Sequence, residues 1–485
     1  MHGKVCEILD IFEQIAAIPR CSKHEEKISQ WLQSWARDKG FTVRADSAGN
    51  VVIEVPASEG YENAPGVVVQ GHMDMVCEKT PDSAHDFSKD PIRPIADGEW
   101  LRADKTTLGA DNGIAIAMSL VLATDKAVSH PSLELLFTVD EEQGLTGAAK
   151  LAPDFIKGRI LLNIDSEDEG VLTVGCSGGK ETRISRPLSF TGLPEDYQIY
   201  RLAVSGLRGG HSGVDIHKHR ASANRILARL LALAQEATDI RLVWIKGGTA
   251  HNAIARDAEA CVAFKSADRD SVAKKISDFE QIVRNEFAAS EKLPSVEISA
   301  PQNGAGQSSH PVISAEDTAR AINLMLALPH GVIGMSPDIK GLVETSTNFA
   351  IVEIKDDALK ILSSQRSSVM SKLDELSQRI EALAALAGAD TESGNAYPAW
   401  EPNMDSPLLQ HCQNTYKKLY GKEPSVEIIH AGVECAILGV KYSGMDMISL
   451  GPTIENPHSP DERINIPTIG KVWDYLVEIL KSFGP

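Results

Sequence analysis

A histidine and an aspartate at the end of one apolar run could do chemistry together. The run at residues 67–69 has the unbroken apolar character of a strand that is buried on both faces of a parallel sheet. His72 and Asp74 follow it two residues apart, so on an extended chain both side chains point to the same side. A carboxylate beside an imidazole orients it and raises its basicity, which is the usual setting of a metal-binding histidine. For this pair alone, two side chains that merely satisfy each other are the plainer explanation.

Further candidate metal ligands stand on separate segments of the chain. Glu142 and Asp165 each follow an apolar run that predicts a strand. Asp111 lies in a polar loop before an apolar helix, and His458 lies in a loop after the last predicted strand. In open α/β sheets the carboxyl ends of the strands and the loops after them form the ligand-binding crevice. We therefore expect these four side chains to meet His72 at one edge of the sheet.

Two histidines with three carboxylates suit two divalent metal ions. Zinc fits this ligand set best, and manganese or cobalt also fits it. If one carboxylate is shared, each ion receives one histidine, one private carboxylate and the shared one. Three carboxylates leave about one positive charge on two divalent ions, which a bridging hydroxide neutralises. Glu141, next to Glu142, could take the proton from the parent water, although paired acidic residues at a strand end are as often simply solvated.

The motifs around these residues resemble those of the dinuclear zinc metallopeptidases related to aminoacylase and carnosinase. They stand in a fixed order along the chain: Gly71–Asp74, Leu108–Gly113, Glu141–Glu142, Asn163–Asp165 and Pro457–His458. The resemblance implies that Asp111 bridges the two ions. It implies further that His458 and Glu142 complete one metal site. His72 and Asp165 would complete the other.

The same resemblance implies the catalytic roles and the branch of the family. Asp74 would orient His72, and Glu141 would be the general base that later protonates the leaving amine. Asp165 stands where the related carboxypeptidases and succinyl-diamine deacylases usually have glutamate. An aspartate at this position resembles the dipeptidase and aminopeptidase branches instead.

Four residues farther along the chain match family positions near the substrate, and the first three lie in a lid domain. The resemblance implies that His211, which follows two glycines, stabilises the tetrahedral oxyanion with help from Asn252. It implies that Arg366 holds the substrate carboxylate, a task that suits a bidentate guanidinium, and that Gly432 approaches the same end of the substrate. From the residues alone, His211 could lie in a plain turn, and Arg366 could be a solvated surface side chain. A phosphate loop is a poor alternative at His211 because no Gly-Lys-Ser/Thr sequence follows.

The order of the predicted elements divides the chain into three segments. Residues 1–186 and 393–485 alternate strands and helices, with acidic residues at successive strand ends. This pattern predicts an α/β domain with a mixed, mostly parallel sheet flanked by helices, and the resemblance implies that it is a zinc-exopeptidase-like catalytic domain. Residues 187–392 contain two rounds of strands and helices, which predicts an inserted α+β lid domain. The two rounds suggest an internal duplication, but their similarity is too weak to establish it.

Composition limits the classes of binding partner and the cellular location that we expect. The net charge of −19, from 48 basic and 67 acidic residues, argues against nucleic acid and anionic membranes as partners, since both require a positive surface. No run of about 18 apolar residues predicts a membrane-spanning helix. Glu7 and Asp10 interrupt the opening segment where a signal peptide needs an apolar core, and the seven cysteines are scattered without a Cys-x-x-Cys pair. We therefore expect a cytoplasmic protein with reduced cysteines.

We expect metal-dependent hydrolysis of dipeptides with a free amino terminus, including those that end in histidine. A bridging hydroxide would attack the peptide carbonyl, with Glu141 as the general base. An N-acyl amino-acid hydrolase on the same scaffold is one alternative. A catalytically silent binding protein is another, against which the complete ligand set argues. The resemblance favours a homodimer formed through the lid, although two rounds of structure could supply His211 within a single chain.

Overall fold

The computed structural model describes residues 3–301, 311–337, 339 and 341–484, and the chain forms two compact units. The first unit contains residues 1–176, 400–429 and 433–485, and the second contains residues 177–399 and 430–432. The sequence suggested that the insertion spans residues 187–392. The division lies outside both of these limits, because strands β9 (Gly178–Pro187) and β21 (Asp390–Tyr397) belong to the sheet of the second unit.

A mixed sheet forms the centre of the first unit, as the sequence predicts. In the described part of the chain it has eight strands in the order β1-β2-β6-β3-β7-β23-β8-β22. Strands β6, β3, β7 and β23 are neighbours and run parallel, whereas β1 and β2 extend the sheet antiparallel. The carboxyl ends of these four strands therefore lie side by side. The strands are β1 (Thr42–Ala45), β2 (Val51–Val55), β3 (Val67–His72), β6 (Leu133–Thr138), β7 (Ile160–Asn163), β8 (Val171–Cys176), β22 (Ser425–Ile429) and β23 (Asp446–Ser449).

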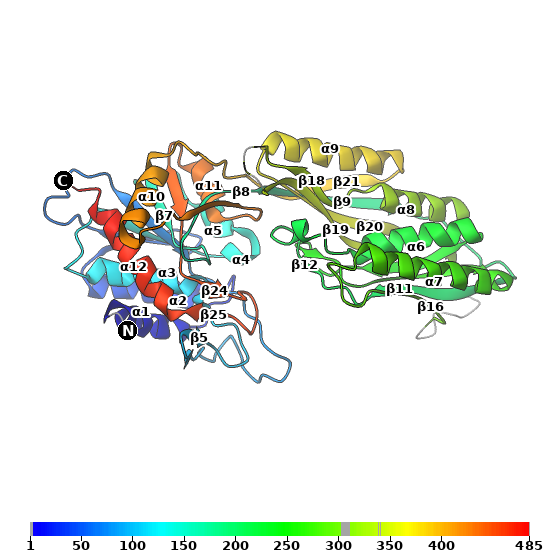
Figure 1. The fold of residues 1–485 in the computed structure, drawn as a ribbon, viewed down its shortest axis with the longest axis horizontal. Helices are drawn as coiled ribbons and strands as arrows, with labels where there is room; N and C mark the ends of the chain where they lie inside the picture. Colours follow the sequence, from blue (N-terminus) through cyan, green and yellow to red (C-terminus); the bar gives the residue numbers. More distant parts are fainter. Residues whose placement is uncertain (1–2, 302–310, 338, 340, 485) are drawn as a thin grey trace. The chain divides into compact units, whose positions relative to one another are not determined.

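Helices pack around this sheet and complete the core of the first unit (Figure 1). Every residue of β3 is buried, which explains why its sequence shows no polar alternation. Helix α3 is buried almost all round because it packs against both β3 and α1. The helices are α1 (Gly3–Ala16), α2 (Glu26–Asp38), α3 (Ala110–Thr124), α4 (Glu141–Gly144), α5 (Thr146–Lys150), α10 (Pro407–Tyr420), α11 (Glu434–Lys441) and α12 (Ile466–Lys481).

A small antiparallel sheet joins the last part of the chain to the loop that precedes α3. Its strands, in spatial order, are β24 (Ile454–Glu455), β25 (Arg463–Asn465), β5 (Trp100–Arg102) and β4 (Ile95–Asp97). Between β25 and β5, Ile464 pairs with Leu101. This pairing brings the residues just before β25 close to the loop after β5, although the two segments are far apart in the sequence.

The second unit is an antiparallel sheet with helices on one face, the α+β architecture that the sequence predicts for the insertion. Among the described residues its main sheet has nine strands, ordered β16-β11-β15-β13-β19-β20-β9-β21 with β18 beside β19. One hydrophobic core contains residues of α6, α7, α8 and α9 together with alternate strand residues such as Leu202 and Val204. The other strand residues of this alternation, such as Arg201 next to Leu202, face the opposite side.

The main sheet of the second unit contains two halves that meet in its middle. Lys246 and Gly247 of β13 pair antiparallel with residues 353 and 352 of β19. This layout corresponds to the two rounds of structure seen in the sequence. The strands are β10 (Phe190–Thr191), β11 (Tyr197–Ser205), β12 (Gly210–His211), β13 (Arg241–Gly247), β14 (Ala253–Ile254), β15 (Ala258–Lys265), β16 (Ser295–Ser299), β17 (Val312–Ile313), β18 (Gly331–Met335), β19 (Val343–Lys355) and β20 (Ala358–Ser367). The helices are α6 (Ala223–Ala237), α7 (Arg269–Glu286), α8 (Ala315–Ala327) and α9 (Met370–Leu386), with 3-10 turns at Ile216–Lys218 and Ser266–Asp268.

Cys21 and Cys77 form a disulfide in the first unit. The scattered cysteine spacing predicted only reduced cysteines, so the expectation is wrong for this pair. The reason is tertiary, because a β-bridge between Cys21 and Met75 aligns two segments whose cysteines lie 56 residues apart. Spacing along the chain gives no sign of that alignment.

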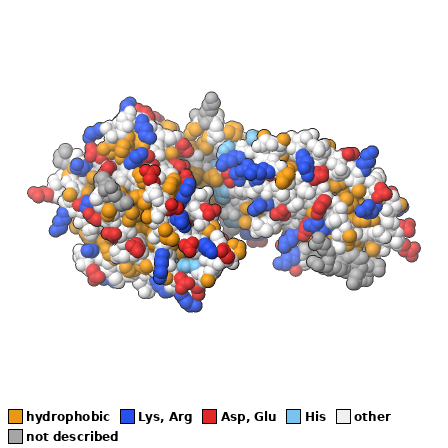
Figure 2. Space-filling model, turned by 60° about the horizontal axis from the view of Figure 1, so that its bottom comes forward, with side chains coloured by type: hydrophobic (Ala, Val, Ile, Leu, Met, Phe, Trp, Pro, Cys, Tyr) orange, Lys and Arg blue, Asp and Glu red, His pale blue; other side chains and the backbone are white. Residues whose placement is uncertain are grey.

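The surface carries both signs of charge. Figure 2 shows acidic and basic side chains interspersed on the face in view. A surface that tracks a nucleic-acid backbone is instead predominantly basic. In the residues that the structure describes, no helix has the length and apolar character needed to cross a membrane.

Candidate functional site

The candidate ligands follow the carboxyl ends of the four parallel strands of the first unit. His72 is the last residue of β3, and Asp165 comes two residues after the end of β7. Glu142 lies beyond β6 in the short helix α4, and His458 lies in the loop beyond β23. Because these strands are adjacent and parallel, the four residues emerge at the same edge of the sheet.

Asp111 reaches this edge from the first turn of α3. Gly71 of β3 lets the helix approach closely, because a Cβ atom there would overlap Asn112 Oδ1. Asn112 Oδ1 accepts a hydrogen bond from the His72 N–H (3.2 Å), and Asn112 Nδ2 donates to the Ile164 carbonyl (2.6 Å). The peptide bond between Asp111 and Asn112 is cis. The first turn of the helix is thus tied to the ends of two strands.

Asp111 lies between the two histidines. Its Oδ1 is 3.1 Å from His72 Nε2, and its Oδ2 is 3.1 Å from His458 Nε2. Asp165 Oδ1 is 3.3 Å from the same His72 nitrogen. Glu142 Oε2 is 3.0 Å from the same His458 nitrogen. The five side chains therefore form two groups, each with one histidine and two carboxylates, and the groups share Asp111.

The separations fit divalent metal ions. In a tetrahedral site with bonds of about 2.0–2.1 Å, neighbouring ligand atoms lie about 3.3 Å apart. The nitrogen-to-oxygen separations here are 3.0, 3.1 and 3.3 Å. Glu142 Oε1 is buried without a hydrogen-bond partner among the described residues, so it can coordinate a cation at no cost in hydrogen bonds. The residues present therefore fit a centre of two divalent ions.

Burial and mutual repulsion shift the pKa values of this cluster. Burial, and then the charge of Asp111, raises the pKa of Glu142 to about 7. Burial also raises the pKa of Glu141. At His458 burial disfavours the charged ring, but hydrogen bonds to Asp111 and Glu142 raise its pKa to about 12. Carboxylates and imidazoles that hold protons this firmly are also strong sites for a cation, which would displace those protons.

Asp74 holds both the first histidine and the acidic pair in place. It is fully buried, and its Oδ1 lies 3.3 Å from His72 Nδ1. The same carboxylate accepts hydrogen bonds from the backbone N–H of Glu141 (3.0 Å) and of Glu142 (3.2 Å), and from Ser22 Oγ (2.8 Å). Burial alone would raise the pKa of Asp74, but the hydrogen bond and charge of His72, followed by the donors of Glu141 and Ser22, hold it below its usual value. The sequence indicated only the contact with His72.

Glu141 lies within reach of the metal-ligand atoms. One of its carboxylate oxygens forms a cluster with ligand atoms of His72 and Glu142, all within 4.8 Å of one another. Its side chain projects from the first residue of α4, directly after the tight turn at Asp140, whose φ is 52°. This position suits a group that exchanges a proton beside the centre.

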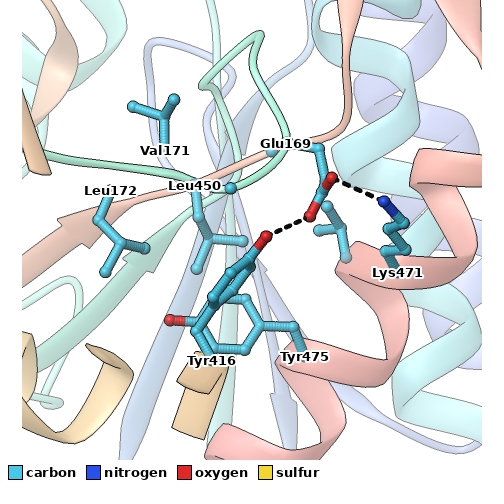
Figure 3. Close-up of a pocket in the computed structure, with 10 residues that line it drawn as sticks. Glu169, Val171, Leu172, Tyr416, Leu450, Lys471 and Tyr475 are labelled. Carbon is cyan, nitrogen blue, oxygen red and sulfur yellow. Dashed lines mark hydrogen bonds and ion pairs between the residues drawn. The ribbon is translucent and has the colours of Figure 1, made fainter. Parts of the chain in front are cut away.

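Glu169, another acidic residue near the strand ends, has a structural role. Glu169 Oε1 accepts a hydrogen bond from Tyr416 Oη (2.7 Å), and Oε2 pairs with Lys471 Nζ (3.0 Å), as Figure 3 shows. The hollow beside them has a volume of about 10 Å³, room for one water molecule at most. These contacts fasten the segment that follows Asp165 to α10 and α12. The hollow is therefore no substrate site.

In the second unit, four residues form a row across neighbouring strands. Tyr397 of β21 pairs with Gly179 of β9, Gly179 pairs with Arg366 of β20, and Arg366 pairs with Ser346 of β19. A Cβ atom on Gly179 would overlap the ring of Tyr397. The glycine therefore lets the tyrosine cross its strand, and Tyr397 Oη accepts a hydrogen bond from Arg366 Nη1 (2.7 Å).

Arg366 is a buried cation whose charge is not neutralised by the residues that the structure describes. The side chain is only 8% exposed, yet it pairs with no carboxylate among the described residues, and its Nε has no hydrogen-bond partner there. His430 lies nearby and binds Ser346 Oγ through Nε2 (2.7 Å). Burial, followed by the charges of Arg366 and His211, lowers the pKa of His430 to about 3. The arrangement suits an anion such as a carboxylate.

The other predicted residues of the lid lie in the same unit. His211 of β12 pairs with Ala253 of β14, and the Ser212 N–H donates to the Asn252 carbonyl (2.7 Å). His211 Nδ1 accepts from the backbone N–H of Gly213 (3.3 Å). In the neutral ring the proton is then on Nε2, which makes that nitrogen a donor.

Gly432 has a packing reason to be glycine. A Cβ atom there would lie 2.6 Å from Tyr397 Cε2. The same ring therefore requires glycine at both 179 and 432. No local signal in the sequence marks Tyr397, because its contacts arise from strand pairing. His430 stands beside Gly432 in the chain and could have been singled out from that motif.

Three comparisons show which known proteins this chain is similar to. The model of "Peptidase family M20/M25/M40" matches residues 68–482. The cytosol non-specific dipeptidase of Escherichia coli (strain K12) is 41% identical over 473 residues, which are 98% of this chain and 96% of that protein.

Solved structures agree with this match. The aminoacylhistidine dipeptidase of Vibrio alginolyticus aligns with a TM-score of 0.84 at 39% identity, covering 100% of this chain and 99% of that one. Aminopeptidase PepT of Bacillus cereus aligns with a TM-score of 0.57 at 17% identity, covering 99% of this chain and 98% of that one. The second likeness concerns the fold alone.

Proposed function

The chain belongs to peptidase family M20/M25/M40, and on this premise we propose that it hydrolyses dipeptides with a free amino terminus at a centre of two divalent metal ions. It is a peptide-bond hydrolase and a dipeptidase, as the sequence predicted. The name of the Vibrio alginolyticus relative supports a range that includes dipeptides ending in histidine. The observation that carries the proposal is the position of Asp111, whose two oxygens face different histidines.

The proposed centre assigns a role to each cluster residue. His72, Asp111 and Asp165 would hold one ion, and Asp111, Glu142 and His458 would hold the other, as the ligand groups suggest. When bound, two divalent ions supply Lewis-acid chemistry, which acidifies a water and polarises a carbonyl oxygen. Zinc is the metal we propose, because imidazole with carboxylate is a ligand set that it commonly takes.

Glu141 would act as the proton carrier. Its carboxylate lies beside the ligand atoms, and it is free to take a proton from the attacking water and return it to the leaving amine. The raised pKa that burial gives this group favours keeping the proton between the two steps. Asp74 would support the reaction indirectly, by fixing the ring of His72 and the backbone of Glu141.

The residues of the second unit would bind the substrate. We assign the carboxylate terminus of the dipeptide to Arg366, because that guanidinium is buried without an acidic partner among the described residues. His211 would donate from Nε2 to the developing oxyanion, with Asn252 beside it. Gly432 would form part of the wall at the carboxylate end, next to Tyr397.

A dipeptide panel tests the proposal most directly. The full chain is treated with a chelator, and turnover of dipeptides ending in histidine and in other residues is measured after zinc, manganese or cobalt is added. Turnover that returns with metal supports the assignment. No turnover with any metal would contradict it, and release of acetate or succinate from acylated amino acids instead would favour a deacylase.

Two further proposals concern assembly and location. The resemblance favours a homodimer formed through the second unit, and light scattering on the purified chain measures its mass directly. The Escherichia coli relative is named a cytosol enzyme, which supports a cytoplasmic location. Fractionation of the producing cells would test it.

A further inference from the structure

Glu462 joins the two loops that carry Asp111 and His458. Its side chain is 2% exposed. Glu462 Oε2 accepts hydrogen bonds from the backbone N–H of Leu108 (2.7 Å) and Gly109 (3.0 Å). Glu462 Oε1 accepts from the N–H of residues 110 (2.8 Å) and 111 (3.3 Å). One carboxylate thus binds four successive amides at the start of α3.

The beginning of α3 needs such a partner. The first N–H groups of a helix have no acceptor within the helix, so a side chain at the N-cap usually supplies one. Here the N-cap is Gly109, with φ at 71°, and it has no side chain to offer. A Cβ atom there would lie 2.5 Å from Arg20 Nη2, so the cap cannot come from this position. The buried carboxylate of Glu462 takes its place and also interacts favourably with the helix dipole.

Arg20 fixes the same loop by donating a hydrogen bond to the carbonyl of Gly109. It is 1% exposed and donates to the carbonyl oxygens of Met73 (3.0 Å), Asp74 (2.9 Å) and Gly109. Burial lowers the pKa of Arg20 to about 10, while the charge of Glu462 opposes that shift. The loop therefore has a buried cation on the carbonyl of Gly109 and a buried anion on its amides, and the same cation ties it to the end of β3. This leaves its backbone little freedom to move.

The position of Glu462 in the chain gives this contact a second consequence. It lies four residues after His458 and just before β25, which pairs with β5. The same carboxylate therefore sets where the His458 loop stands relative to Asp111. His458 Nε2 lies 3.1 Å from Asp111 Oδ2 across these two loops.

We propose that Glu462 is a positioning residue of the metal centre, which holds Asp111 so that its two oxygens face His72 and His458. The inference rests on the proposed metal centre but not on the identity of the substrate. Residues that orient metal ligands through hydrogen bonds typically change metal affinity by about 10–100-fold when they are replaced.

Zinc affinity of the full chain tests this role. Glu462→Gln keeps the shape of the side chain but places a donor where two N–H groups need an acceptor. We expect zinc to bind about 10–100-fold more weakly in equilibrium competition with a chelator. Glu462→Asp keeps the charge and shortens the reach, and it should also weaken binding. Wild-type zinc affinity in both variants would overturn the proposal.

Asp446→Asn is the matched control. Asp446 is a half-buried carboxylate that also caps a helix, accepting from Ser406 Oγ (2.6 Å) and the Leu408 N–H (3.1 Å) at the start of α10. It lies at the amino end of β23, away from the strand ends that carry the ligands. We expect near wild-type zinc affinity here. An equal loss in this control would assign the effect to general destabilisation and contradict the proposal.

Two measurements distinguish the positioning role of Glu462 from general destabilisation and from the proposed function. Unfolding temperatures of all variants in excess chelator report the fold without metal, and a loss of zinc affinity at an unchanged unfolding temperature supports positioning. If the wild-type chain binds zinc but cleaves no dipeptide, the proposed function fails while the zinc measurement still decides the role of Glu462.

Discussion

The two units bury opposite charges. In the first, Asp111, Glu142 and Asp165 gather around two histidines, with Glu141 beside them. In the second, Arg366 is buried without a carboxylate partner among the described residues. Unbalanced buried charge is costly in free energy unless a ligand of opposite sign accompanies it. The difference indicates that the first site suits cations and the second suits an anion, which in the proposed function would be the metal ions and the carboxylate end of a dipeptide.

The two sites are also held in different ways. The candidate ligands of the first unit stand at the ends of separate strands and helices or in a loop, and side chains such as Asp74 and Glu462 fix these segments by binding backbone amides. The anion site of the second unit is a row across paired strands, so the register of the sheet positions Arg366. The first site should therefore be sensitive to distant loop contacts, and the second to residues in the same row.

The largest loss of turnover is expected at the acidic site of the first unit. Glu141→Gln removes the proton carrier without removing any proposed ligand, so kcat should fall by about 10²–10⁴-fold. Metal content, measured by elemental analysis, should stay at the wild-type level. Turnover close to wild type would contradict the role of Glu141 and would favour a base elsewhere.

At the anion site, Arg366→Met should impair recognition of the substrate carboxylate. A hydrogen bond to a charged group contributes about 1.5–3 kcal/mol, so kcat/KM for a dipeptide should fall by about 10–100-fold relative to the matching dipeptide amide. Comparing the acid and the amide isolates the carboxylate.

Arg225→Met is the control for Arg366→Met. Arg225 is another partly buried guanidinium of the second unit, but it donates to the backbone carbonyls of Leu326 (2.8 Å) and Leu328 (2.9 Å). Its replacement should leave the ratio between acid and amide unchanged. If both variants changed that ratio equally, Arg366 would not be the carboxylate partner.

Acidic pH should weaken the fold of the second unit through His430. Its pKa is about 3 in the folded chain because of burial and then the charges of Arg366, His211 and His217. The unfolded value is about 6.5. Between these values the unfolded chain binds a proton that the folded chain does not, so stability falls as the pH drops below about 6.5.

The pH effect can be measured by urea unfolding. The contribution of His430 is at most about 1.4 kcal/mol per pH unit, or about 2 kcal/mol between pH 6.5 and 5. His430→Gln should remove this part of the pH dependence. Asp317, whose pKa is held at about 2 by Arg186 against the effect of burial, should contribute only at lower pH. An unchanged slope in the variant would contradict the assignment.

The smallest effect is expected from Tyr397→Phe. Removal of one hydrogen bond costs about 1 kcal/mol, so KM for a dipeptide should rise about fivefold while kcat stays close to wild type. The dipeptide amide should be affected less. Tyr200→Phe is the control, because Tyr200 is buried in the same unit and its Oη donates a hydrogen bond to Gln198 Oε1 (3.2 Å), away from Arg366. Equal losses for acid and amide would show that Tyr397 does not act through Arg366.

Much of the first site could be predicted from the sequence. Each ligand except Asp111 follows an apolar strand, and adjacent parallel strands end at a common edge. The family resemblance added the bridging role of Asp111 and the residues proposed to bind the substrate. The roles of Ser22 and Glu462 could not be predicted, because Ser22 donates to the carboxylate of Asp74 and Glu462 binds backbone amides, in both cases in segments far away in the sequence.

The sequence by itself determined the type of chemistry, because the kinds of ligand and their places after apolar strands suit divalent ions. It also determined the α/β class, through alternating strands and helices. Only the tertiary structure decided that Asp111 faces two histidines, that Cys21 pairs with Cys77, and that Tyr397 meets Arg366. These contacts depend on strand register and on the close approach of distant segments. Residues such as Gly71 and Gly179 permit that approach, but their places in the sequence do not predict it.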